Sequence, residues 1–113
     1  MTGTNLTART ILYTAATELE RAGYHSVRVA GSERLFDLVA WSRKNVLFVT
    51  IKRTRNGGIS QFSEEVGEIA SFLSKNPLPG MVQFWIFTSN TWLIYQILPG
   101  GALLLKGGIH ESL

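Results

Sequence analysis

The stretch FDLVAWSRKNVLFVTIKRT, residues 36–54, contains two apolar runs separated by four polar residues. The first run begins one residue before this stretch, so the runs cover 35–41 and 46–52, and both are rich in β-branched and aromatic residues, a composition typical of β-strands. The polar residues between them, 42–45, predict a tight turn. We therefore expect an antiparallel pair of strands, around which the rest of the domain is arranged.

Three side chains of chemical interest lie on these strands. Side chains alternate across a strand, so Thr50 and Lys52 share one face, and the short turn places Asp37 opposite them on the neighbouring strand. An unpaired charge inside an apolar strand is costly. Asp37 therefore needs a partner, which is Lys52, a bound cation, or water at the edge of the sheet.

An aspartate beside a lysine is an arrangement that phosphodiester chemistry can use. Mg²⁺ prefers near-octahedral oxygen ligands, commonly one or two carboxylates with waters and a phosphate oxygen. The metal stabilises the developing charge, and a nearby lysine holds the phosphate or the attacking water. Asp37 supplies the minimum of one carboxylate, whereas the Thr50 hydroxyl is a neutral and weaker ligand. Short motifs also arise by chance, and a strand threonine beside an Asp37–Lys52 ion pair explains the same spacing without a metal.

The remaining elements follow from periodicity and turn residues. Apolar residues recur at helical spacing over 7–22 and 60–75, which predicts two helices. Strands are expected at 24–30, and at 81–88 and 91–98 as a hairpin around Ser89-Asn90. The segment near 103–105 is a candidate for an additional short strand and is not counted in the sheet. The predicted order is α-β-β-β-α-β-β, an α/β fold in which helices flank a mixed five-stranded sheet.

The basic residues are concentrated in one half of the chain. The net charge is +3, but residues 1–55 hold nine Lys and Arg against four acids, and residues 56–113 hold two against four. A one-sided positive field attracts phosphate backbones. An ordinary solvated surface accounts for the same composition, so charge alone leaves both interpretations open.

Length and composition favour one folded domain covering residues 1–113. The 45% hydrophobic content is globular, and no apolar run is long enough to span a bilayer. The chain contains no cysteine, which excludes disulfides and thiolate zinc sites. The first residues lack the pattern of a secretory signal peptide, so we expect a cytoplasmic protein without a membrane partner.

Two segments resemble the PD-(D/E)xK nuclease superfamily, and within it the archaeal Holliday junction resolvases. RAGYHSVRVAGSERLFDLVA, residues 21–40, is similar to that family's helix end, first strand, Arg-x-Ala-Gly-Ser loop and Asp-Leu-Val-Ala strand. VLFVTIKRTR, residues 46–55, resembles its strand ending in Glu-x-Lys. A helix from Ser60 and the hairpin GMVQFWIFTSNTWLIYQI, residues 80–97, follow in the expected order, so the similarity covers roughly residues 7–105.

The resemblance implies a restriction-endonuclease-like core and a role in DNA recombination or repair. Residue by residue, it implies that Asp37 binds Mg²⁺, that Lys52 is the motif lysine, and that Ser32 lies near the scissile phosphate. Together with the crowding of basic side chains, it implies a set of DNA-binding residues: Arg28, Arg34, Arg43, Lys44, Arg53 and Arg55. Resolvases of this type pair as homodimers on branched DNA, so the same partners are expected here.

Two departures from the family pattern weaken the expected metal site. Thr50 stands where the second metal-binding carboxylate belongs, and no acid occupies the position near Leu12 where the first-helix glutamate would fall. Glu18 and Glu20 lie on the same predicted helix, but Glu18 is six residues further along. Loss of even a supporting partner of a metal site costs about 10–100-fold in affinity or activity.

Three hypotheses follow. The first is a DNA-binding protein with a resolvase-like fold and a degenerate metal site. The second is an active Mg²⁺-dependent endonuclease that uses an atypical site built on Asp37 and Lys52. The third is a non-catalytic dimerisation or regulatory module, in which Lys52 pairs with Asp37. Trp85, Trp92 and Tyr95 are expected in the core or in a dimer interface, and stacking on bases is the alternative.

Overall fold

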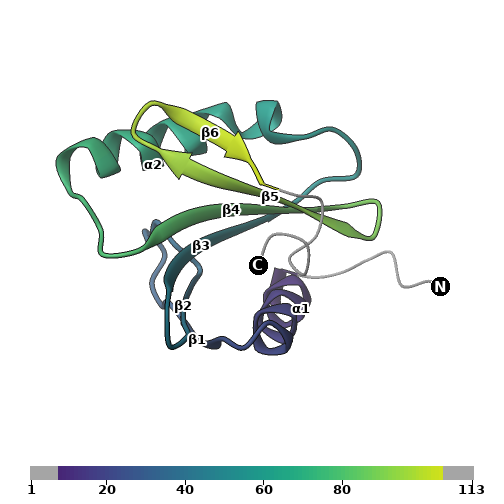
Figure 1. The fold of residues 1–113 in the computed structure, drawn as a ribbon. Helices are drawn as coiled ribbons and strands as arrows, with labels where there is room; N and C mark the ends of the chain where they lie inside the picture. Colours follow the sequence, from purple (N-terminus) through teal and green to yellow (C-terminus); the bar gives the residue numbers. More distant parts are fainter. Residues whose placement is uncertain (1–7, 106–113) are drawn as a thin grey trace.

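The computed structural model describes residues 8–105, which fold into two α-helices, a 3-10 helix and one six-stranded sheet (Figure 1). The elements in chain order are α1 (Ala8–Arg21), β1 (His25–Arg28), β2 (Leu38–Trp41), β3 (Val46–Arg53), η1 (Ile59–Phe62), α2 (Ser63–Lys75), β4 (Met81–Thr88), β5 (Thr91–Leu98) and β6 (Gly101–Leu104).

The strands lie in the sheet in the same order as in the sequence, from β1 to β6. Only the central pair, β3 and β4, is parallel, and the chain crosses between them through η1 and α2. All other neighbours are antiparallel. The predicted mixed α/β fold is confirmed. The sheet has one strand more than the five predicted, because the short segment after the hairpin pairs with β5 as β6.

The two helices cover opposite faces of the sheet and enclose two apolar cores. Alternation along β3 directs Val49 toward the core beneath α1 and Phe48 toward the core beneath α2. On α1 the side chain of Leu19 is fully buried, and on α2 Ile69 is almost fully buried. Burial of one such side chain contributes about 2 kcal/mol to folding. Figure 1 shows α1 beside β1–β3 and α2 along β5 and β6.

The first strand of the opening hairpin is shorter than predicted. The apolar run begins at residue 35, but β2 begins at Leu38, because the backbone bends at Leu35 and Asp37. The turn after β2 forms as expected: Ser42 N–H donates to the Asn45 carbonyl over 2.8 Å.

The second helix also differs from prediction at its start, since η1 replaces the first residues of the range 60–75 and α2 begins at Ser63. The first predicted helix is observed as α1, and residue 7 at its start lies outside the described part of the chain. Within residues 8–105, no helix has both the length and the apolar character needed to span a membrane.

Candidate nucleic-acid interface

Asp37 lies immediately before β2, where the chain enters the sheet. The antiparallel register pairs Leu38 with Val49, so one further residue places Asp37 across from Thr50. The backbone N–H of Asp37 donates to the carbonyl of Val49 over 2.8 Å, which extends the pairing to this position. The predicted convergence of Asp37 and Thr50 is confirmed.

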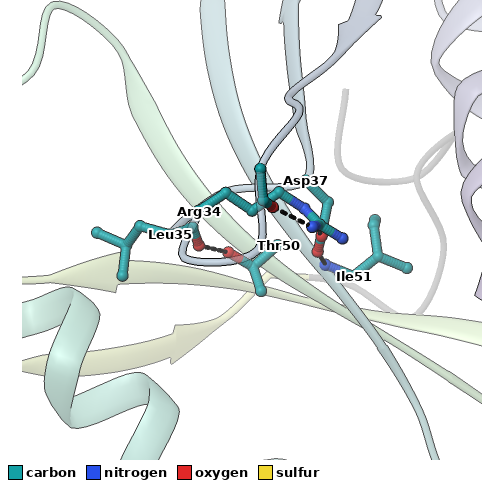
Figure 2. Close-up of polar contacts among 6 residues, drawn as sticks. Arg34, Leu35, Asp37, Thr50 and Ile51 are labelled. Carbon is teal, nitrogen blue, oxygen red and sulfur yellow. Dashed lines mark hydrogen bonds and ion pairs between the residues drawn. The ribbon is translucent and has the colours of Figure 1, made fainter.

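Both oxygens of the Asp37 carboxylate accept hydrogen bonds from the chain itself (Figure 2). Arg34 Nε donates to Oδ1 over 3.0 Å, and the N–H of Ile51 donates to Oδ2 over 2.8 Å. The side chain of Asp37 is only 16% exposed, and a carboxylate in such a place requires these partners. The expectation of an ion pair between Asp37 and Lys52 is wrong, because Arg34 supplies the positive charge.

Arg34 is held in place from two sides. Besides its bond to Asp37, its Nη1 donates to the carbonyl of Gly31 over 2.6 Å. Gly31 has a φ of 108°, a backbone conformation that favours glycine, and this turn brings the carbonyl to the guanidinium. The loop before β2 is therefore shaped around the Arg34–Asp37 pair.

Thr50 has a structural contact that a carboxylate could not make. Its side chain is buried on β3, and its hydroxyl donates to the carbonyl of Leu35 over 2.9 Å (Figure 2). An ionised glutamate only accepts hydrogen bonds, so it cannot replace this donor. Thr50 thus attaches the loop before β2 to the central strand, at the position where the resemblance places a metal ligand.

Lys52 reaches across to the second helix. Its Nζ lies 3.6 Å from Oε2 of Glu65 on α2, and the two side chains are 34% and 41% exposed. An ion pair this exposed contributes at most about 1 kcal/mol, because water screens it and two long side chains must be ordered. Lys52 is therefore available to exchange Glu65 for another anion.

An acidic pocket lies on the α2 side of Asp37. It has a volume of about 230 Å³, and its walls include Ser32, Arg34, Thr50 and Lys52. Three acids also line it, Asp37, Glu65 and Glu68. Glu65 and Glu68 were not among the site residues predicted from the sequence. A usable signal was present, since Glu65 lies four residues before the buried Ile69 and therefore faces the sheet.

The acids of this pocket do not fit a Mg²⁺ site as they are arranged. Asp37 directs both oxygens to donors of the chain, and Glu65 is paired with Lys52. Across residues 8–105, no three His, Cys, Asp or Glu side chains are grouped so that they could hold a metal ion. Mg²⁺ needs near-ideal octahedral oxygen geometry, and this donor set does not provide it.

A second pocket, here called the basic pocket, lies on the α1 side of Asp37. Its volume is about 270 Å³, and its apolar wall is formed by Ile11, Leu12 and Ile51. Its charged residues are Arg34, Lys52 and Arg53 against the single acid Asp37. Arg34, Lys52 and Asp37 line both pockets. The two pockets therefore differ in charge through Arg53 on the α1 side and through Glu65 and Glu68 on the α2 side.

Leu12 occupies the position where the resemblance leads one to look for a missing acid. The structure places Leu12 on α1, 8% exposed, in the wall of the basic pocket that Asp37 also lines. An apolar side chain therefore fills this place beside Asp37. Glu18 pairs instead with Arg21 on the same helix, at 3.1 Å.

The other predicted DNA-binding residues are spread over the molecule. Arg28 lies on β1, and Arg55 lies in the exposed loop after β3. Arg43 and Lys44 lie in the turn at the far end of β2, away from Asp37, and line neither pocket. The structure therefore gathers Arg34, Lys52 and Arg53 at Asp37, and it does not bring Arg43 or Lys44 to them.

The aromatic residues of the β4–β5 hairpin belong to the interior, as expected. Trp85 is fully buried, Trp92 is 6% exposed, and their rings meet edge to face at 5.3 Å. Tyr95 is partly buried against the core beneath α2. Neither tryptophan is accessible for stacking on a base.

Comparison with known proteins identifies a similar fold. No protein-family model matches the chain, and no curated protein sequence does. Among solved structures, the Holliday junction resolvase Hjc of the archaeal hyperthermophile Archaeoglobus fulgidus superposes with a TM-score of 0.62 at 17% sequence identity. The alignment covers 80% of this chain and 77% of that one. The protein thus has the fold of an archaeal Holliday junction resolvase.

Proposed function

We propose that this protein binds DNA through the basic pocket and its surroundings, and that it does not hydrolyse it. The observation that carries the proposal is the Arg34–Asp37 pair, which places a positive charge of the chain itself on the acid expected to hold a metal. A cation fixed at this position favours the binding of a phosphate and disfavours the binding of Mg²⁺.

Two further observations support DNA as the partner. Lys52 and Arg53 flank the pocket, and each phosphate that they neutralise releases counterions from the nucleic acid. The fold is that of a Holliday junction resolvase, a class of protein that acts on branched DNA. We therefore propose branched DNA as the preferred form, in the context of recombination or repair.

Binding is tested by filter binding to a four-way junction and to a duplex over a range of salt concentrations. We expect affinity to fall steeply with salt, with the slope lowered by about one unit each in Lys52→Ala and Arg53→Ala. Lys75→Ala removes the same charge from the far end of α2 and should leave the slope unchanged. The proposal is wrong if the wild type shows no salt-dependent binding, or if all three variants behave alike.

We also propose that the protein forms a homodimer. Leu98 on β5 and Leu103 on β6 are 41% and 53% exposed. Strand pairing and alternation place both on the same face of the sheet, opposite to α2. An apolar pair on one face suits an isologous contact, in which the same patch of both subunits meets around a two-fold axis. The approximate two-fold symmetry of a four-way junction favours such a dimer.

A further inference from the structure

A second groove lies between α1 and β1, next to the basic pocket. Its volume is about 290 Å³, and it is lined by Arg9, Leu12 and Tyr13 of α1, by Ser26 and Arg28 of β1, and by Leu38 of β2. Leu12 lines the basic pocket as well, so the two hollows adjoin. We call this hollow the α1–β1 groove.

The α1–β1 groove carries positive charge without any acid. Arg9 and Arg28 are both exposed, and within residues 8–105 neither guanidinium makes a hydrogen bond or an ion pair. No Asp or Glu lines the groove, while Leu12 and Leu38 form a buried apolar floor. Unpaired guanidinium groups around an apolar floor favour a ligand that is anionic and also has a flat apolar part.

Tyr13 provides a flat surface at the rim of this groove. Its side chain is 75% exposed, which is unusual for a large aromatic residue. Tyr13 follows Arg9 by four residues, so the two side chains lie on one face of α1. An exposed ring beside arginines is the combination on which nucleic-acid bases stack without regard to sequence.

We propose that the α1–β1 groove binds one unpaired nucleotide of a DNA strand, with the base stacked on Tyr13 and the phosphates held by Arg9 and Arg28. The inference rests on the proposed function, because the strand would reach the groove from the basic pocket. Within a duplex both faces of a base are covered by its neighbours, so the groove selects bases that are unpaired, as in a single strand or at a branch point.

The test measures fluorescence anisotropy of a labelled oligothymidylate and of a labelled blunt duplex of equal length. Tyr13→Leu should weaken binding of the oligothymidylate by about 5- to 150-fold, the range expected for loss of one stacked base, and change duplex binding less than twofold. Tyr13→Phe keeps the ring and should bind as the wild type does. Because Tyr13 is exposed, these variants should keep the thermal stability of the wild type.

The phosphate contacts are tested with the same probes. The double variant Arg9→Ala/Arg28→Ala should lower the salt slope for the oligothymidylate by about two units. Arg21→Ala, a charge removed from the other end of α1, is the matched control and should not lower it. If Tyr13→Leu binds oligothymidylate as tightly as the wild type, the groove proposal fails while DNA binding stands. If the wild type binds neither probe, both proposals fail.

Discussion

At the scale of single residues, Arg34 determines what the site can do. One oxygen of Asp37 accepts from the Ile51 amide, and the other accepts from the guanidinium of Arg34, which already supplies the positive charge that a divalent ion would bring. The sequence showed that Asp37 needed a partner, which could be Lys52, a bound cation or water. It could not show which one, because Arg34 reaches Asp37 only through the bend of the loop between Gly31 and β2.

Thr50 should contribute to stability through its hydroxyl. Thr50→Val keeps the shape of the side chain but leaves the Leu35 carbonyl without its donor. We expect a loss of about 1–2 kcal/mol in the free energy of unfolding, or about 4–8 °C in Tm. Thermal unfolding monitored by circular dichroism measures the change. Thr91→Val, at an exposed strand position, is the control. Equal stability of the two variants would remove the structural role of the Thr50 hydroxyl.

Glu65 should compete with DNA for Lys52. Glu65→Gln removes the paired carboxylate, so we expect DNA affinity to rise by about two- to fivefold at low salt, in line with the strength of an exposed ion pair. Glu64→Gln removes the same charge from the neighbouring exposed position, so a smaller increase is expected from it. Anisotropy titrations of both variants compare the two effects. Identical increases in DNA affinity would mean that the loss of one negative charge matters and the Lys52–Glu65 ion pair does not.

At the scale of elements, much of the fold followed from the sequence. The hairpin of β4 and β5 was predicted to the residue, because Ser89 and Asn90 adopt the positive φ angles of 51° and 60° that a two-residue turn requires. The start of β2 was misplaced by three residues. Apolar alternation continues to residue 35, and only the tertiary bond from Thr50 to the Leu35 carbonyl shows that this part has left the strand.

The orientation of α2 could not be predicted from periodicity. Helical spacing showed which side of α2 is apolar, but not which residues of the sheet that side faces. In the structure the crossover from β3 to β4 places α2 beside β5 and β6, and this brings Glu65 and Glu68 to the pocket at Asp37. The packing of α2 against the sheet therefore determines the ion-pair partner of Lys52, and no local sequence pattern indicates it.

The exposed residues Leu98 on β5 and Leu103 on β6 lead to a prediction about the proposed dimer. Leu103→Glu places a charge in the proposed contact between two subunits, so the variant should be monomeric at concentrations where the wild type is dimeric. Light scattering after size-exclusion chromatography measures the mass. Leu104→Glu makes the same change at an equally exposed residue on the opposite face of β6, and it should disturb the dimer less. A monomeric wild type, or equal effects of both variants, would contradict this interface.

At the scale of the whole molecule, the surroundings of Asp37 are more acidic toward α2 and more basic toward α1. The acids of α2 surround the pocket on one side of Asp37, while basic side chains line the other side and continue into the α1–β1 groove. Glu65 and Glu68 come from the acidic half of the chain and Arg53 from the basic half, and the fold places them on different sides of Asp37. A DNA strand is therefore expected along α1, which Figure 1 shows beside β1–β3.

Binding and cleavage measured together on one substrate test the central claim most directly. A labelled four-way junction is titrated with the protein in Mg²⁺, in Mn²⁺ and in EDTA, and the same samples are then analysed on denaturing gels. We predict that neither metal raises the affinity above its value in EDTA and that the substrate stays intact throughout, since Arg34 supplies the positive charge at Asp37. Metal-dependent cleavage by the wild type that is lost in Asp37→Asn, a variant that keeps one acceptor oxygen, would contradict the account.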